Sequence, residues 1–174
     1  MTEEEIIQRC QAGDRESFHS IVDRYKDVLY GTAFLMTNSR TAAEDHVQET
    51  FIAAWRGIGG FHNGHPMKPW LVRILVNKVL SYRRSVSAAK LVTIDKDIAS
   101  NTAVDGPAEE VEKRDLLEQA MSRITPEQRE VIQLRYFTGL SLAETAAVLK
   151  RREGTVKSQA HRALEQMRMV LEAH

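Results

Sequence analysis

Apolar residues recur every three or four positions through most of this 174-residue chain. In residues 15–35 the repeating apolar positions are Phe18, Ile21, Val22, Tyr25, Val28 and Leu29. In residues 39–58 they are Val47, Phe51, Ala54, Trp55 and Ile58. This period belongs to amphipathic helices, and no useful stretch alternates apolar with polar residues as a half-buried strand does. We therefore expect an all-α protein without a sheet.

A break in this periodicity divides the chain into two small helical domains. Residues 85–108 read SVSAAKLVTIDKDIASNTAVDGPA, a mixture of small, polar and acidic residues that ends in Asp-Gly-Pro. We predict a first domain over 1–86, a flexible linker over 87–110 and a second domain over 111–174. In the second domain, Thr125 with Pro126 and Gln128 predicts one helix start, and Ser141 with Glu144 predicts another.

Charge is unevenly distributed, although the formal net charge is zero. Residues 66–84 hold five Lys or Arg and no acid, and residues 150–174 hold six against three acids. Between them, residues 95–118 carry eight acids and three bases. Two basic regions favour two surfaces that meet a polyanion such as nucleic acid.

Several functional classes are excluded by what the sequence lacks. The one cysteine, Cys10, allows neither an internal disulfide nor a thiolate metal site, and the acidic N-terminus has no signal-peptide run. No apolar stretch is long enough to cross a bilayer, so we expect a cytoplasmic protein without membrane insertion. The six histidines show no metal-ligand spacing, and no phosphate loop or nucleophile motif is present. We expect no enzyme activity, cofactor or metal.

Residues 139–168 have the pattern of a helix-turn-helix. A short helix with Leu142, Ala146 and Leu149 precedes a turn through 151–154, and small residues at 143, 146 and 147 allow a close crossing. The apolar face of the longer second helix comprises Val156, Ala160, Ala163, Leu164 and Met167. The turn and the outward face carry donors suited to bases and phosphates: Arg151, Arg152, Thr155, Lys157, Ser158, His161 and Arg162. A helical hairpin with a solvated basic face is the alternative.

Four segments, in order, resemble the extracytoplasmic-function (ECF) sigma factors, a compact group of the sigma-70 family. They are IIQRCQAGDRESFHSIVDRY (6–25), AEDHVQETFIAAWRGIGGF (43–61), PMKPWLVRILVNKVLSYRR (66–84) and the whole of 125–168. The resemblance implies a subunit that directs core RNA polymerase to promoters and helps to open them, in a stress or environmental response. It also implies three partners: core polymerase, through its β′ clamp coiled coil and β flap, promoter DNA, and an anti-sigma factor.

The resemblance also implies roles for residues of the first domain. One helix face, which by itself reads as a solvated acidic face, would dock on the polymerase clamp: Asp45, Gln48, Glu49 and Ile52. The glycine-rich loop and the next helix would hold the melted −10 element: Phe61, His62, Asn63, Trp70, Asn77, Lys78, Tyr82, Arg83 and Arg84. By spacing alone, Trp70 fits the core equally well.

In the second domain, the resemblance assigns the basic helix face to the −35 element and adds Gln159. The family commonly has Arg at this position, so Gln159 either reads adenine or faces the first helix of the motif. The strongest rival is a response-regulator-type helix-turn-helix protein, whose DNA-binding domain has a similar pattern. Such a domain follows a receiver domain with strands, which the N-terminal half does not predict. A protein-binding adaptor leaves the two basic regions unexplained.

Overall fold

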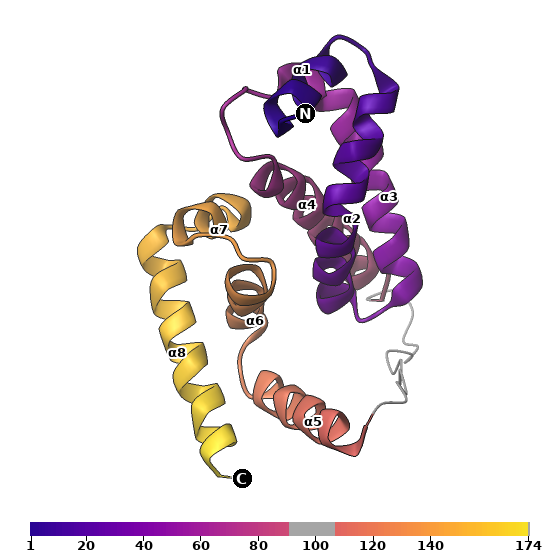
Figure 1. Cartoon of the computed structure of the whole chain (residues 1–174). Coiled ribbons are helices and arrows are strands. Elements are labelled where there is room, and N and C mark those ends of the chain that lie inside the picture. The colour runs from indigo at the N-terminus through magenta and orange to yellow at the C-terminus, as the bar shows by residue number, and fades with distance from the viewer. Residues whose placement is uncertain (91–106, 174) are drawn as a thin grey trace. The chain divides into compact units, whose positions relative to one another are not determined.

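The computed structural model of the protein describes residues 1–90 and 107–173 (Figure 1). Both ranges are helical, and neither contains a strand, which confirms the all-α expectation. Residue contacts divide the chain into two compact units, Met1–Asp97 and Ile98–His174. The ends of the predicted linker are wrong, because residues 87–90 and 108–110 are helical. Its remaining residues, 91–106, lie outside the described ranges.

The described part of the first unit, residues 1–90, contains four α-helices: α1 (Glu3–Gln11), α2 (Arg15–Thr37), α3 (Arg40–Gly57) and α4 (Met67–Lys90). A 3₁₀ turn, η1 (Ile58–Gly60), follows α3 and leads into the loop before α4. Polar side chains begin three of these helices by accepting backbone N–H bonds: Thr2, Asp14 and Ser39. The Ser17 hydroxyl and the backbone amides beside it hold the pKa of Asp14 below its ordinary value.

The core of the first unit lies between α2, α3 and α4. Ile21, Leu29, Leu71 and Leu75 are almost completely buried, as the apolar periodicity predicts. Met67 is also fully buried. The short helix α1 is held on α2 by Glu3, which accepts hydrogen bonds from Arg24 (3.1 Å) and Tyr25. Burial and this bond to Glu3 both raise the pKa of Tyr25.

One polar side chain in this core lacks hydrogen bonds. His46 on α3 is 7% exposed, and neither ring nitrogen has a hydrogen-bond partner among the described residues. Its ring packs edge-on against Tyr82 of α4, with 5.2 Å between the ring centres. A buried polar group without a partner costs about 1–3 kcal/mol. Burial of the His46 ring therefore lowers the free energy of unfolding of the first unit.

Replacing His46 with leucine should stabilise the first unit. We expect His46→Leu to raise its free energy of unfolding by about 1–2 kcal/mol, because the orphaned nitrogens are removed at similar volume. Urea unfolding followed by tryptophan fluorescence measures this unit, since both tryptophans, Trp55 and Trp70, lie in it. The exposed His19 supplies the control: His19→Leu should change stability by less than about 0.5 kcal/mol. Equal or lower stability of His46→Leu contradicts the prediction.

Residues 107–173 of the second unit also contain four α-helices: α5 (Ala108–Ser122), α6 (Pro126–Ile132), α7 (Leu142–Leu149) and α8 (Glu153–Glu172). Both predicted helix starts are confirmed. Thr125 Oγ1 accepts from the Gln128 amide at 3.2 Å, and Gln128 Oε1 accepts from the Thr125 amide at 2.9 Å. Ser141 and Glu144 form the same reciprocal pair at the start of α7.

Helix α8 is the centre of this unit and packs on α5, α6 and α7. Its buried side chains enter two clusters, one around Ala163 and Met167 and one around Val156 and Ala160. Three predicted packing positions are wrong. Leu164 is 41% exposed, and alanines 143 and 147 are exposed as well. Residues 145 and 148 are buried instead.

A π-helical segment, η2 (Gln133–Phe137), continues α6 and was not predicted. The Thr138 amide donates to the Gln133 carbonyl five residues earlier, at 3.0 Å. Such a wider turn holds one more residue than an α-helical turn. It leaves Tyr136 and Phe137 57% and 54% exposed, whereas Thr138 is buried. Gly139, at φ 75°, then leads into α7.

Candidate nucleic-acid and protein interfaces

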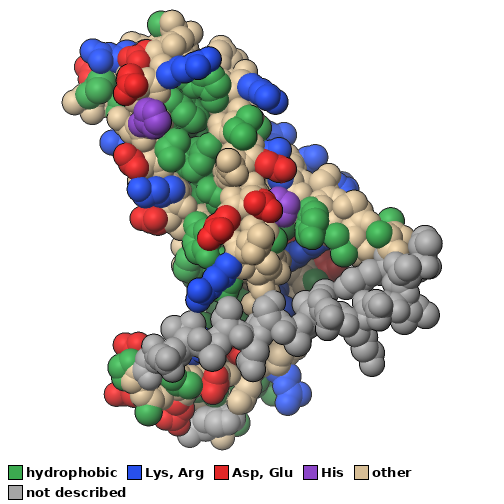
Figure 2. All heavy atoms as spheres, turned by 90° about the vertical axis from the view of Figure 1, so that its right-hand side faces the viewer, with side chains coloured by type: hydrophobic (Ala, Val, Ile, Leu, Met, Phe, Trp, Pro, Cys, Tyr) green, Lys and Arg blue, Asp and Glu red, His purple; other side chains and the backbone are tan. Residues whose placement is uncertain are grey.

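The predicted protein-binding face of α3 is open to solvent. Asp45, Gln48, Glu49 and Ile52 are all exposed, and Ile52 is exposed to 46%. Figure 2 views the first unit from the side on which α3 lies in Figure 1, and acidic side chains are visible among hydrophobic ones there. Two carboxylates and an amide around one aliphatic group suit a basic helical partner.

An ion pair joins this α3 face to helix α4. Glu49 Oε2 lies 3.7 Å from Lys78 Nζ, and Glu49 is 60% exposed while Lys78 is 30% exposed. The sequence assigned Glu49 to a protein partner and Lys78 to DNA. The structure therefore brings the edges of the two predicted surfaces into contact.

The predicted −10 residues divide into exposed, half-buried and buried groups. The exposed ones are His62, Asn63, Asn77, Tyr82 and Arg84. Trp70, Lys78 and Arg83 are half-buried. Phe61 is the exception, since it is only 7% exposed. Phe61 therefore packs in the core of the unbound unit, and its DNA contact stays a prediction.

Phe61 and Trp70 close the glycine-rich loop onto α4. Their ring centres lie 5.0 Å apart, and the rings are tilted by 59°. Gly57 lies under Trp70, because a Cβ at Gly57 would be 3.5 Å from Trp70 Cζ2. Trp70 is half-buried, so it packs against Phe61 and Gly57 but keeps part of its surface accessible, and its DNA contact stays a prediction.

The C-terminal half of α4 carries the remaining predicted −10 residues. Tyr82 is 49% exposed and rests against His46. The Arg83 guanidinium donates to the Met36 carbonyl near the end of α2, which fixes its direction. Arg84 is exposed. An aromatic ring can stack on a base of a single strand, and the neighbouring guanidinium groups can bind its phosphates.

Gln11, at the end of α1, holds the same loop from the other side and was missed by sequence reasoning. Its side-chain nitrogen Nε2 donates to the Ile58 carbonyl at 3.1 Å and to the Phe61 carbonyl at 2.8 Å. Its oxygen Oε1 accepts from Asn63 Nδ2 at 3.3 Å. These partners lie about fifty residues away in sequence, so no local spacing identifies them.

In the second unit, α8 presents its predicted DNA-binding face to solvent. Lys157, Ser158, His161 and Arg162 are all exposed, and so are the Arg152 and Thr155 side chains at its start. The residue at the N-cap position, Arg152, makes no side-chain cap, so the first amides of α8 have no side-chain acceptor there. His161 also lies 3.3 Å from Glu165. Basic side chains at the open positive end of a helix suit a phosphate backbone.

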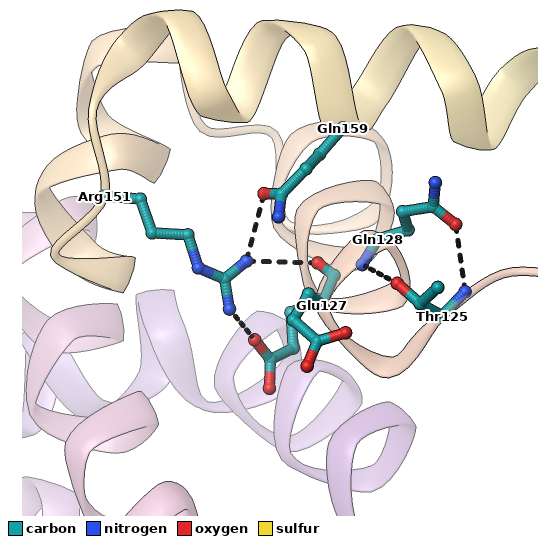
Figure 3. Close-up of polar contacts among 6 residues, drawn as sticks. Thr125, Glu127, Gln128, Arg151 and Gln159 are labelled. Atoms are coloured by element: carbon teal, nitrogen blue, oxygen red, sulfur yellow. Dashed lines mark hydrogen bonds and ion pairs between the residues drawn. The ribbon is translucent and has the colours of Figure 1, made fainter.

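Arg151 has a structural role in the unbound chain (Figure 3). Its guanidinium lies 2.6 Å from Glu130 and donates to the Glu127 carbonyl at 3.1 Å and to Gln159 Oε1 at 3.3 Å. Arg151 thereby ties the turn of the helix-turn-helix to α6 and α8, and Gln159 points toward Arg151 and α6. The predicted phosphate contact of Arg151 stays a prediction.

Removing Arg151 should loosen the second unit. We expect Arg151→Ala to cost about 2 kcal/mol, because Glu130, only 11% exposed, loses its ion-pair partner. In the full chain, the slowest amides of α6 and α8 should then exchange with solvent deuterium about 30-fold faster. Arg152→Ala is the matched control, since this neighbouring side chain is exposed and has no ion pair among the described residues. The same exchange rate in both variants contradicts the prediction.

Two further expectations concern metals and membranes. The described part of the chain has no cluster of three or more His, Cys, Asp or Glu side chains arranged to hold a metal ion. Within residues 1–90 and 107–173, no helix combines the length and the apolar character needed to span a bilayer.

Two all-helical units, one of them ending in a helix-turn-helix with a basic exposed face, define a helical DNA-binding protein. Family comparison makes this class specific. Residues 21–88 match the model of sigma-70 region 2, and residues 114–167 match the model of sigma-70 region 4. The response-regulator alternative requires a receiver domain in the N-terminal half of the chain. Sigma-70 region 2 matches that half instead, so this alternative is not favoured.

Curated relatives cover nearly the whole chain. The ECF RNA polymerase sigma factor SigW of Bacillus subtilis is 31% identical over 176 residues, covering 95% of this chain and 94% of SigW. The ECF RNA polymerase sigma factor BldN of Streptomyces coelicolor is 33% identical over 172 residues, with 96% of this chain covered. The chain spans 65% of the length of BldN.

Two solved structures with similar folds show the matching chain in complex with another protein. The sigma factor RpoE of Bartonella quintana, in complex with the anti-sigma factor NepR, matches with a TM-score of 0.75 and 26% identity, covering 90% of this chain and 98% of that one. CnrH, in complex with the cytosolic domain of CnrY, matches with a TM-score of 0.72 and 26% identity, covering 98% and 97%. The chain belongs to the ECF sigma factors of the sigma-70 family.

Proposed function

We propose that this protein binds core RNA polymerase, directs it to a specific class of promoters and helps to open their −10 element. Membership in the ECF sigma factors carries the proposal, together with one observation. The residues of α8 proposed to face DNA are exposed, namely Thr155, Lys157, Ser158, His161 and Arg162, whereas Gln159 is half-buried. Sigma factors are transcription initiation factors, so the chain itself has no catalytic residues in this proposal.

The α3 face is the proposed contact with the β′ clamp. Asp45 and Glu49 supply charge for a basic coiled coil, and Ile52 supplies the apolar centre that such interfaces place among polar groups. Because these side chains are already exposed and lie on one regular helix, docking requires little rearrangement. The second unit would meet the β flap.

The loop before α4 and the outer face of α4 are the proposed −10 site. Its accessible members are His62, Asn63, Trp70, Asn77, Lys78, Tyr82, Arg83 and Arg84. Exposed or half-exposed rings provide stacking platforms, and the cations hold the backbone of the separated strand. Phe61 supports this site from the core.

The start of α8 is the proposed −35 site. Lys157, Ser158, His161 and Arg162 are presented by the second helix of a helix-turn-helix, the element that enters the major groove in such motifs. Arg152 and Thr155 lie where a phosphate would approach the helix start. Arg151 and Gln159 form the support beneath this face.

An anti-sigma factor is the proposed regulatory partner. The support is a pair of structurally similar complexes, the sigma factor RpoE bound to the anti-sigma factor NepR and CnrH bound to the cytosolic domain of CnrY. The exposed α3 face offers a surface that such a partner would compete for with polymerase. A stress or environmental signal that releases the partner would then activate transcription.

In vitro transcription tests the proposed function. Cognate core polymerase is supplied with a promoter library, with and without the purified chain. We expect specific starts that share −35 and −10 elements only when the chain is present. Binding of duplex DNA by the chain without any specific start would favour a conventional regulator, and neither activity would leave a protein-binding adaptor.

A further inference from the structure

We propose that Gln11 is a positioning residue for promoter opening: it fixes the loop before α4, and the direction of Asn63 within it, without touching DNA. The inference rests on the proposed −10 role of this loop. It assigns part of the −10 selectivity to a side chain of α1, outside the segments to which promoter contacts were assigned.

The hydrogen bonds of Gln11 determine which way its amide points. Nε2 lies between two carbonyl oxygens, those of Ile58 at 3.1 Å and Phe61 at 2.8 Å. An amide oxygen in that place would face two acceptors, so the nitrogen must occupy it. Both amide hydrogens are then used, and Oε1 is the atom that remains for Asn63.

The orientation of the Gln11 amide also determines the orientation of the Asn63 amide. Gln11 Oε1 can only accept, so the atom of Asn63 that lies 3.3 Å from it must be the nitrogen Nδ2. Asn63 is exposed, and its oxygen Oδ1 accepts no hydrogen bond from the described residues. Gln11 therefore leaves Oδ1 of Asn63 available as an acceptor for a base at the surface of the loop.

The rest of the loop has few other constraints. Gly59, Gly60 and Gly64 lack side chains, and Gly64 adopts a φ of 88°. Within the loop, the amides of Phe61 and His65 donate to Ile58 and His62. The Phe61–Trp70 contact holds one side of the loop, and Gln11 holds the other. A loop ordered before binding loses less entropy when it takes up an unstacked base, and it selects that base more sharply.

The anchor itself is well placed to hold the loop. Gln11 is the last residue of α1, and it is half-buried. Helix α1 is fixed at its other end by the bonds from Arg24 and Tyr25 to Glu3, and it buries Ile7 and Cys10 at 3% and 1% exposure. The loop is thus attached to a rigid element.

Gln11→Glu is the test variant, because it keeps the size of the side chain but places an oxygen against two carbonyl oxygens. Gln11→Ala is a second variant that removes the bonds without adding charge. Gln8→Glu is the matched control, since Gln8 lies on the same helix with an exposed side chain. Each full-length variant is used with core polymerase on a promoter library randomised at both promoter elements.

We expect both Gln11 variants to lower the preference for the favoured base at one −10 position by at least about tenfold. Preferences at the −35 element should change less than about twofold, because that site lies on a separate unit. In the free full chain, the amides of Phe61 and His65 should exchange with solvent deuterium at least about tenfold faster. The Gln8→Glu variant should match the unmodified chain in each measurement.

An unchanged −10 preference in both Gln11 variants, in reactions that still give specific starts, overturns the positioning role. A merely structural role of Gln11 would instead lower the yield from all promoters alike, and that result also overturns it. No specific start from the unmodified chain overturns the proposed function itself, and the two failures are therefore distinguishable.

Discussion

The affinity of the variant Ile52→Arg for core polymerase should be at least about 100-fold lower than that of the unmodified chain. This is the largest single effect that we expect at the proposed interfaces. Ile52 is 46% exposed on α3 and is the one large aliphatic side chain among the acidic and amide groups of the proposed clamp contact. Arginine there removes the apolar anchor and places a cation against a basic partner. Because the side chain is exposed, the fold should be unaffected within about 0.5 kcal/mol.

The measurement is a binding titration of labelled full-length chain with core polymerase at fixed salt. Leu35→Arg is the control, because Leu35 is another exposed aliphatic residue of the same unit, 39% exposed on α2. This control should bind within about twofold of the unmodified chain. Tight binding by Ile52→Arg removes the α3 face from the proposed interface, whatever the promoter assays show.

The second large effect is expected at the start of α8. Arg162→Ala should reduce −35-dependent promoter binding by polymerase containing this chain by at least about tenfold, and it should relax base preference at one −35 position. Lys157→Ala, if Lys157 contacts phosphate, should weaken all sequences alike and lower the salt dependence of binding. Both side chains are exposed, so their loss should leave the helix-turn-helix intact.

These variants are compared on promoter DNA over a series of salt concentrations. Lys113→Ala is the charge-matched control, since Lys113 lies on α5 of the same unit, 72% exposed and paired with Glu109. It should change neither base preference nor the slope of affinity against salt. If Arg162→Ala and Lys113→Ala behave alike, α8 does not read the −35 element through this face.

Local rules predicted the helices and their starts well. The Thr125 and Ser141 capping boxes depend on residues three positions apart, and the period of the apolar residues depends on a few turns. Exposure of the α3 face followed from the same period, since Asp45 and Ile52 lie opposite the buried positions. These features need no information from distant parts of the chain.

Contacts between distant residues could not be predicted in this way. Arg151 looks like a free cation in a basic turn, but it is paired with Glu130, twenty-one residues earlier. Phe61 looks accessible on a glycine-rich loop, but Trp70 and the core cover it. Gln11 reaches partners about fifty residues away. Each of these positions depends on tertiary packing, which a spacing pattern does not contain.

The π-helical segment Gln133–Phe137 holds one residue more than an α-helical path over the same turn would need. The wider turn absorbs this extra residue locally, so the residues after it keep nearly the orientation that an uninterrupted α-helix would give them. Deleting one residue here should therefore restore α-helical geometry while Ser141, at the start of α7, keeps its orientation about the axis of α6. The extra residue changes what the turn exposes, since Tyr136 and Phe137 both lie at the surface of this segment.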